Sequence, residues 1–211
     1  RANTMAAIRR LPPEISLMFN PYARDLEDWV LRARLAGHEV FIGLPMESEN
    51  FPIEDGGPLA LDSHIQLKEN MARLEKVLSK MTSYVGVVSM LGSKFKRADG
   101  QLRPVLTAIR DRGLMFVDGS PGRSAVGRIA SEINLPKAMV DIILDKDPSG
   151  SAVSRRLADL EAAIRTKGTA IASGRAYPSS LRSIATWAEN LKTKNLTLVP
   201  VSAIADKQFV E

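Results

Sequence analysis

The sequence contains no cysteine and only two histidines, and aromatic residues make up 5% of its 211 positions. Without cysteine, the chain can form neither disulfides nor thiolate metal sites. No apolar run approaches the roughly 18 residues that a membrane-spanning helix needs, so we expect no transmembrane segment. Basic residues outnumber acidic ones by 29 to 24, a net charge of +5. That excess is compatible with anionic partners but too small to name one.

The basic residues are scattered along the chain rather than gathered in one segment. Arg9-Arg10 and the group Lys94, Lys96 and Arg97 lack the interleaved aromatic residues on which nucleic-acid bases stack. We therefore predict no nucleic-acid partner and interpret these groups as solvated surface. The hydrophobic share of 45% and the charged share of 25% fit one globular domain over residues 1–211.

Short runs rich in Val, Ile, Leu and Phe alternate with segments of helical spacing along the whole chain. The runs predict buried strands at Ile15–Phe19, Glu39–Leu44, Val85–Met90, Leu114–Val117, Val140–Leu144, Ala170–Ser173 and Thr197–Val201. Repeated alternation of strand and helix implies parallel pairing through right-handed crossovers. The sequence therefore predicts an α/β fold, either a barrel or a doubly wound sheet.

The amino-terminal segment Thr4–Leu11 has helical spacing, but no strand precedes it. A β/α fold ordinarily opens with a strand, so we expect the first strand to lie upstream of Arg1. Catalytic side chains in these folds project from the carboxyl ends of strands. A residue on that upstream strand could therefore belong to the site.

Several polar side chains follow the predicted strands directly, at their carboxyl ends. Because parallel strands finish at the same edge of a sheet, we expect these side chains to meet on one rim. The candidates are Asn20, Glu47, Ser89, Ser93, Asp118, Asp145 and Arg175. Glu47 and Asp118 are the candidate catalytic groups, and the other five are candidate substrate-binding groups. The long connection Met46–Asp62 could fold over this rim.

Each candidate also has a purely structural interpretation. An Asp directly after a strand, such as Asp118 or Asp145, is often a turn or cap residue. Asn20 precedes Pro21 and could simply organise a turn. The loop Asp118–Ser124 could form an anion-binding nest, although a plain Gly/Pro turn explains the same residues. The sequence leaves these alternatives open.

The two histidines are predicted to lie away from the rim. His38 falls in the turn before a strand, at the opposite edge, and His64 falls at a helix start beyond the long loop. We therefore expect structural or solvent-exposed roles for both. Zinc needs imidazole or thiolate ligands as a rule, so we expect no zinc site. An all-oxygen site for Mg²⁺, Mn²⁺ or Ca²⁺ could still form from Asp118, Asp145 and Glu47.

A set of short segments resembles the divergent polysaccharide deacetylase family, in order and spacing, across nearly the whole chain. The segments are Phe19-Asn20-Pro21-Tyr22-Ala23, Ala36-Gly37-His38-Glu39-Val40, Leu44-Pro45-Met46-Glu47, Gly57-Pro58-Leu59, Asn70-Met71-Ala72-Arg73-Leu74, Tyr84-Val85-Gly86-Val87-Val88, Gly92-Ser93-Lys94-Phe95, Gly113-Leu114-Met115-Phe116-Val117-Asp118 and Tyr177-Pro178. No single segment is diagnostic, but the set is specific.

The family resemblance implies a distorted β/α barrel of seven or eight mostly parallel strands, related to carbohydrate esterases that remove N- or O-acetyl groups. Such enzymes use a divalent metal, commonly zinc, to activate water, with a carboxylate as general base. The resemblance also implies an acidic pair on the first strand, a polysaccharide or oligosaccharide as partner, and a periplasmic or otherwise exported location.

The sequence departs from the family at its two metal-binding histidines. Met90 stands at the first histidine position, in Val88-Ser89-Met90-Leu91, and Arg175 stands at the second, in Gly174-Arg175-Ala176-Tyr177-Pro178. A thioether and a permanently charged guanidinium cannot replace two neutral imidazoles on a metal, so we expect no metal cofactor in this chain. Two hypotheses follow. One is a hydrolase with a rebuilt site, and the other is a non-catalytic relative that uses Arg175 to hold an anionic sugar polymer.

Overall fold

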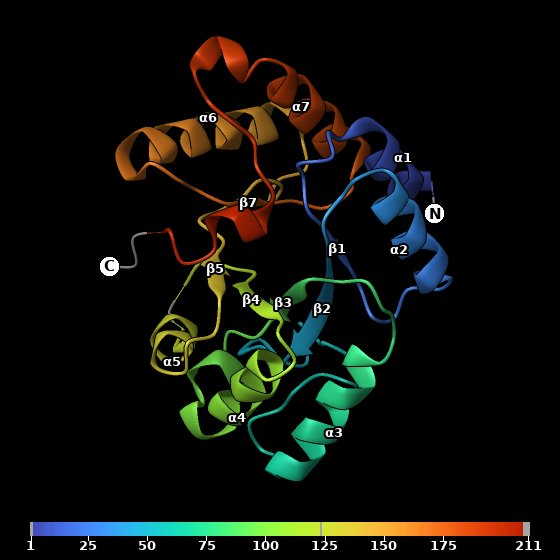
Figure 1. Cartoon of the computed structure of the whole chain (residues 1–211), viewed down its shortest axis with the longest axis vertical. Helices are drawn as coiled ribbons and strands as arrows, with labels where there is room; N and C mark the ends of the chain where they lie inside the picture. Colours follow the sequence, from blue (N-terminus) through green and yellow to red (C-terminus); the bar gives the residue numbers. More distant parts are fainter. Residues whose placement is uncertain (1, 123, 209–211) are drawn as a thin grey trace.

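The computed structural model describes residues 2–122 and 124–208, in which helices surround a central group of strands (Figure 1). The elements follow one another in chain order as α1 (Ala2–Arg10), β1 (Leu17–Phe19), α2 (Leu26–Leu35), β2 (Val40–Met46), α3 (Leu67–Leu78), β3 (Gly86–Leu91), the 3₁₀-helix η1 (Phe95–Arg97), α4 (Asp99–Arg110), β4 (Met115–Asp118), α5 (Val126–Glu132), β5 (Lys137–Met139), β6 (Ile142–Ile143), α6 (Gly150–Lys167), β7 (Ala172–Ser173), α7 (Pro178–Glu189), and the 3₁₀-helices η2 (Lys192–Lys194) and η3 (Val201–Ile204).

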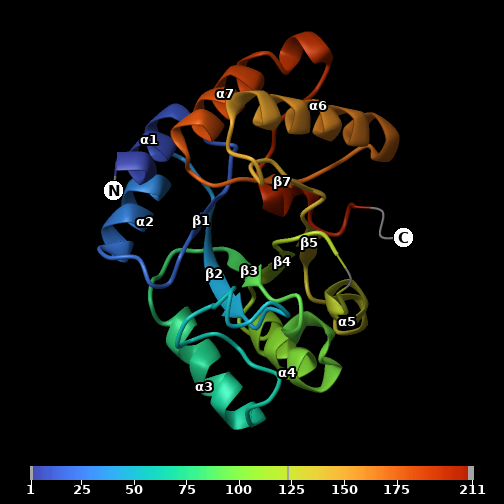
Figure 2. The same cartoon turned by 180° about the vertical axis from the view of Figure 1, so that it is seen from behind.

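The larger sheet has five parallel strands in the order β1-β2-β3-β4-β5. Each strand therefore pairs with its neighbour in the sequence, and the connecting helices return the chain to the same end each time. All five strands consequently present their carboxyl ends at one edge, which confirms the predicted α/β class and parallel pairing. Figures 1 and 2 show α3, α4 and α5 on one side of the strands and α6 and α7 on the other.

The remaining strands, β6 and β7, form a separate two-stranded parallel sheet. The chain passes from one sheet to the other at Val140 and Asp141. The amide of Val140 donates to the carbonyl of Asp118 at 2.9 Å, whereas the amide of Asp141 donates to the carbonyl of Ile171 at 2.9 Å. One stretch of extended chain thus exchanges its pairing partner, from β4 to β7.

A single barrel of seven or eight strands is not confirmed, because the described strands divide into these two sheets. Among the described strands, β7 does not pair with β1. Ala7 and Leu11 of the α1 region pack against Leu181 of α7 in a small apolar cluster. The expectation of a strand upstream of Arg1 stays a prediction.

The strand predicted at Thr197–Val201 is wrong. Residues 196–200 form no regular element, and the 3₁₀-helix η3 follows them. Two polar side chains bind this segment in place of a strand partner. Ser16 Oγ accepts the amide of Val201 at 3.0 Å, and a carboxylate oxygen of Glu39 accepts the amide of Ser202 at 3.2 Å. Because these residues directly precede β1 and β2, the segment lies at the amino ends of the strands.

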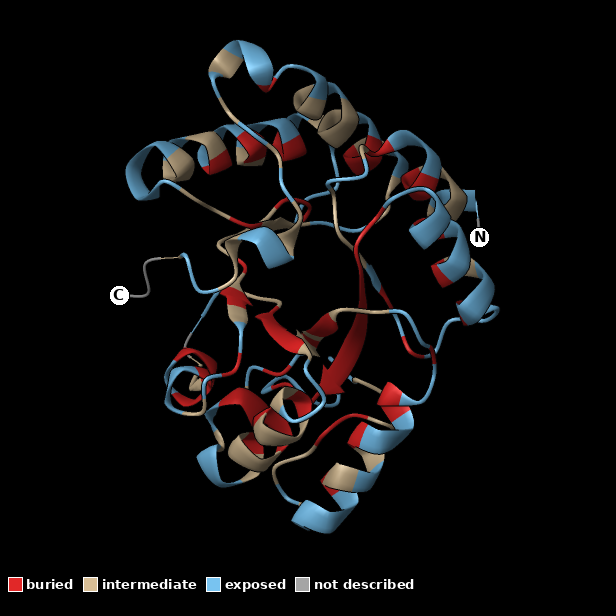
Figure 3. Cartoon of the chain, in the orientation of Figure 1, coloured by how far each residue is buried: buried red, intermediate tan, exposed pale blue. Residues whose placement is uncertain are grey.

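The core lies between the large sheet and its helices, and every residue of β2 is buried (Figure 3). His38 is also buried, just before β2. Its Nδ1 lies 2.8 Å from the carbonyl oxygen of Ile15, and its Nε2 lies 3.1 Å from that of Ile8. The predicted structural role of His38, at the edge opposite the rim, is confirmed. Among the described helices, none is long and apolar enough to cross a membrane.

Candidate functional site

The candidate residues lie at the carboxyl ends of the strands, in separate groups rather than in one cluster. Glu47 follows β2, Ser89 and Ser93 belong to the end of β3, and Asp118 is the last residue of β4. The other groups lie farther along the rim: Asn20 follows β1, while Asp145 and Arg175 follow β6 and β7.

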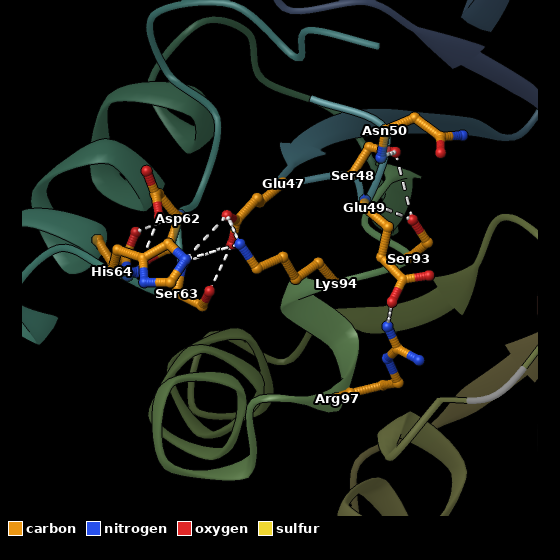
Figure 4. A network of polar contacts seen from close by, with 11 residues as sticks. Glu47, Ser48, Glu49, Asn50, Asp62, Ser63, His64, Ser93, Lys94 and Arg97 are labelled. Atoms are coloured by element: carbon orange, nitrogen blue, oxygen red, sulfur yellow. Dashed lines mark hydrogen bonds and ion pairs between the residues drawn. The ribbon is translucent and has the colours of Figure 1, made fainter. Parts of the chain in front are cut away.

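Glu47 is the centre of a polar network (Figure 4). Its backbone carbonyl accepts the amides of Lys94 and Phe95 at 3.2 and 3.3 Å, which fixes the loop after β3 beside the end of β2. One carboxylate oxygen, Oε1, accepts the ammonium group of Lys94 at 2.7 Å. The other, Oε2, accepts the amide of Ser63 at 2.9 Å and its hydroxyl at 2.5 Å. Ser63 therefore orients Glu47, and α3 begins four residues later at Leu67.

His64 is brought to this rim, which contradicts the prediction that the rim lacks imidazole. Its Nε2 lies 2.6 Å from the ammonium nitrogen of Lys94 and 3.6 Å from Oε1 of Glu47. The residue before Ser63, Asp62, accepts the amide of His64 on Oδ1 at 2.8 Å. The long connection after β2 thus returns to the strand end where it began, and an isolated Met46–Leu61 bridge holds it there.

The pKa of Glu47 lies below its ordinary value. Burial alone would raise this pKa, but the hydrogen bonds from Lys94 and Ser63 to the carboxylate, together with the Lys94 charge, outweigh burial. Glu47 is therefore ionised at neutral pH and has a low affinity for a proton. A carboxylate with a lowered pKa is a poor general base near pH 7.

Asp118 forms the second carboxylate group and is fully buried. Its Oδ1 accepts a hydrogen bond from the ammonium of Lys96 and one from the Ser89 hydroxyl at 3.3 Å. Lys96 also donates to the hydroxyl of Ser120 at 3.0 Å. The other oxygen, Oδ2, is buried without a hydrogen-bond partner. The interpretation of Lys96 as solvated surface is wrong, because its side chain is only 3% exposed.

Gly119 allows β3 and β4 to come together at this point. A Cβ atom at Gly119 would lie 2.2 Å from the backbone oxygen of Ser89, so no other residue fits without a backbone shift. With glycine there, the amide of Gly119 donates to Ser89 Oγ at 2.9 Å. The loop considered as an anion nest, residues 118–124, begins with two residues that already bind the protein. The Asp118 carboxylate binds Lys96 and Ser89, and the Gly119 amide binds Ser89. Arg123 of this loop lies outside the described residues.

Ser93 binds the start of the long loop rather than Asp118. Its hydroxyl accepts the amide of Glu49 at 3.0 Å and lies 3.3 Å from the hydroxyl of Ser48. Ser48 in turn donates to the Glu54 carboxylate. Ser93 thus fixes the loop that follows Glu47.

Asp145 and Arg175 form a group of their own at the end of the small sheet. Oδ2 of Asp145 accepts the backbone amide of Arg175 at 2.5 Å and the hydroxyl of buried Ser180 at 3.2 Å. The guanidinium of Arg175 is exposed and donates to the Tyr177 hydroxyl at 3.1 Å. Asp145 therefore fixes the backbone of Arg175 and leaves its side chain at the surface.

Asn20 organises a turn, accepting the amide of Tyr22 at 2.9 Å. Tyr22 itself joins the end of β1 to the long loop, because its hydroxyl donates to the carbonyl of Gly56 and accepts the amide of Leu59, both at 2.9 Å. The Tyr22 ring stays 40% exposed at the rim. Nothing in the local sequence around Tyr22 indicates that its ring would be held at the rim.

The residues present do not fit the divalent metal that the family resemblance implies. At the family's first histidine position Met90 packs over Gly43 of β2, and at the second Arg175 carries an exposed guanidinium that donates to the Tyr177 hydroxyl. The all-oxygen site considered for Asp118, Asp145 and Glu47 is not formed by the described residues, where the one group with metal-ligand spacing is Glu47, Asp62 and His64. The ammonium of Lys94 already binds two members of that group.

Comparison with known proteins places this architecture in a family. A family model described as divergent polysaccharide deacetylase matches residues 1–205. An uncharacterized protein of Haemophilus influenzae is 29% identical over 189 residues, which cover 88% of this chain and 66% of the relative. The uncharacterized protein YibQ of Escherichia coli is 24% identical over 206 residues, covering 95% of this chain and 62% of the relative. The chain thus spans just under two thirds of the length of these curated relatives.

A solved structure supports the same assignment. The crystal structure of an uncharacterized protein from Agrobacterium tumefaciens C58 superposes with a TM-score of 0.93 at 35% sequence identity. The match covers 97% of this chain and 83% of the other. Together with the family model, which matches nearly the whole chain, this likeness shows that the chain belongs to the divergent polysaccharide deacetylase family.

Proposed function

We propose that this protein binds an anionic glycan along the rim and does not hydrolyse it. One observation carries the proposal: both candidate catalytic carboxylates are held by lysine ammonium groups, Glu47 by Lys94 and Asp118 by Lys96. Family membership supports a polysaccharide or oligosaccharide as the ligand. The resemblance also supports an exported, periplasmic location, which we include in the proposal.

The lysine pairs argue against deacetylation because acetyl hydrolysis needs an activated water. In this family type, activation comes from a metal and a carboxylate base. Glu47 has a lowered pKa, and Asp118 is neutralised inside the protein by Lys96. Met90 and Arg175, at the family's histidine positions, cannot supply imidazole.

Arg175 is the residue we assign to anion recognition. No carboxylate of the described chain lies within ion-pair distance of its guanidinium, whose one side-chain partner there is the Tyr177 hydroxyl. A guanidinium offers a planar pair of donors that matches a carboxylate or phosphate. Because Asp145 holds the Arg175 backbone, the side chain projects from a fixed point.

The exposed ring of Tyr22 supports a sugar ligand at the same rim. Its hydroxyl is held by two backbone groups, so the ring keeps its orientation without a ligand. A fixed aromatic face offers apolar contact area at little cost in side-chain entropy, which suits the apolar face of a sugar ring. We assign Tyr22 to packing against a sugar ring and Arg175 to binding the anionic group of the ligand.

The test measures binding of two oligosaccharides by calorimetry, one containing uronic acids and one neutral and acetylated. We expect Arg175→Ala to weaken binding of the acidic ligand about tenfold or more and to leave the neutral ligand nearly unchanged. Arg182→Ala, which removes an exposed arginine from α7, is the matched control and should change neither affinity. Equal losses of affinity for both ligands in Arg175→Ala would contradict the assignment of Arg175 to anion binding.

A second candidate function, a hydrolase with a rebuilt site, is favoured by the unpartnered Oδ2 atom of Asp118. A buried carboxylate oxygen without a partner is costly, and such atoms occur at functional sites. If the protein releases acetate from acetylated chitooligosaccharide or xylan, and Glu47→Gln or Asp118→Asn abolishes the release, the hydrolase replaces the binding proposal.

A further inference from the structure

We infer that Lys94 is an internal cation that closes a divalent transition-metal site formed by Glu47, Asp62 and His64. Glu47, Asp62 and His64 have the spacing of metal ligands, but the ammonium group of Lys94 binds two of them. It concerns residues outside the family's own histidine positions, and it does not depend on the glycan proposal.

The three side chains have the chemistry and spacing of metal ligands. One ligand atom from each lies within 4.8 Å of the other two, and together they offer two carboxylate oxygens and one imidazole nitrogen. Mixed oxygen and imidazole ligands suit zinc and its neighbours in the first transition row better than Mg²⁺ or Ca²⁺. Figure 4 shows Glu47 and His64 at the end of the Lys94 side chain, with Asp62 beside His64.

The carboxylate of Glu47 and the backbone of Asp62 are held in place by neighbouring groups. Ser63 fixes one oxygen of Glu47 through its amide and its hydroxyl. Buried Asn70 accepts the amide of Asp62 at 3.0 Å and donates to its carbonyl at 2.7 Å. Ligands oriented by such outer contacts lose little freedom when they bind an ion, which favours metal affinity.

Lys94 makes two of the three contacts that an ion at this site would make. Its ammonium nitrogen lies 2.7 Å from Glu47 Oε1 and 2.6 Å from His64 Nε2, so the imidazole presents its Nε2 lone pair to the positive charge. The Lys94 side chain is 39% exposed and reaches the group on a flexible stem. A partly exposed ammonium of this kind neutralises the carboxylate and yet can be removed without opening the core.

The experiment removes the charge of Lys94 and keeps its stem, with the variant Lys94→Met. Zn²⁺ affinity is measured by competition with a chromophoric chelator, and Co²⁺ is added separately to record its visible absorption spectrum. We expect Lys94→Met to bind Zn²⁺ about tenfold or more tightly than the wild-type protein and to give a Co²⁺ spectrum of a site with a nitrogen ligand. Lys80→Met, at an exposed lysine after α3, should behave as wild type.

A second variant ties the gain to these ligands. In Lys94→Met combined with His64→Ala, the increase in Zn²⁺ affinity should disappear, since the imidazole is lost. Affinity in Lys94→Met no tighter than in the wild type, or a gain that persists without His64, would overturn the inference. Should Lys94→Met fold poorly by circular dichroism, Lys94→Gln tests the same charge. Failure of the Arg175 experiment leaves these outcomes untouched, so the two proposals fail separately.

Discussion

Lys94 and Lys96 are two residues apart, and each pairs with a carboxylate at the end of a neighbouring strand, yet their surroundings differ sharply. The pair Lys94–Glu47 has side-chain exposures of 39% and 10%, whereas the pair Lys96–Asp118 has exposures of 3% and 1%. Water reaches the first pair and hardly reaches the second. The comparison shows that the same lysine–carboxylate contact can be replaceable where water reaches it and structurally required where the pair is buried.

The local backbone explains how neighbours in the sequence reach such different depths. Phe95, between the two lysines, is fully buried and begins the 3₁₀-helix η1. Lys94 directly precedes this helix and Lys96 lies within it, and with three residues per turn their side chains point in different directions on either side of Phe95. One side faces the long loop and the other faces the end of β4.

The largest expected effect is on the buried pair. Lys96→Met leaves the buried carboxyl group of Asp118 without its cationic partner, so we expect the unfolding free energy to fall by about 3–5 kcal/mol in chemical denaturation. The double variant Lys96→Met with Asp118→Asn removes the uncompensated charge and should recover much of that loss. A loss below about 1 kcal/mol in the single variant would show that the pair is more hydrated than its burial indicates.

A middle-sized effect is expected for Glu47→Gln, about 1–2 kcal/mol at pH 7, because the charge-assisted hydrogen bonds from Ser63 and Lys94 are lost. The folded-state pKa of Glu47 is lowered from an ordinary value of 4.5, so ionised Glu47 stabilises the fold above that value. The stability difference between wild type and variant should stay constant near neutrality and shrink as pH falls below about 4.5. A difference that grew on acidification would contradict the lowered pKa.

The smallest effect is expected for Lys94→Met. Loss of a partly exposed ion pair should change the unfolding free energy by less than about 1 kcal/mol, measured by the same denaturation as for Lys96→Met. The contrast between the two methionine variants is the direct test of the comparison. Equal losses would mean that depth does not separate the two pairs.

Much of the fold was predictable because strand and helix patterns are local. The apolar runs ending at Phe19, Leu44 and Val117 predicted β1, β2 and β4, and their alternation with helical segments predicted parallel pairing. The strand predicted at Thr197–Val201 failed for a non-local reason: the amides of residues 201 and 202 are satisfied by Ser16 and Glu39, far away in the sequence. The change of pairing partner at Val140–Asp141 is likewise a tertiary event.

The site was predictable only in part. Glu47 and Asp118 were located correctly at the strand ends, because a parallel sheet fixes where its carboxyl ends meet. Lys96, the cationic partner of Asp118, was misinterpreted as surface, since nothing near it in the sequence indicates burial. Lys94, the partner of Glu47, is partly exposed as expected. His64 and Asp62 were missed because the long loop returns to its starting point, and loop paths are not periodic.

By itself, the sequence determined the α/β class, the parallel pairing of the strands and the absence of thiol chemistry, since these depend on composition and local spacing. Only the tertiary structure decided which charges meet and how deep they lie. Lys94 binds a carboxylate 47 positions away, and Lys96 binds one 22 positions away in the other direction along the chain. Such choices depend on how strands and loops pack, and the physical consequence of each pair depends on the water left around it.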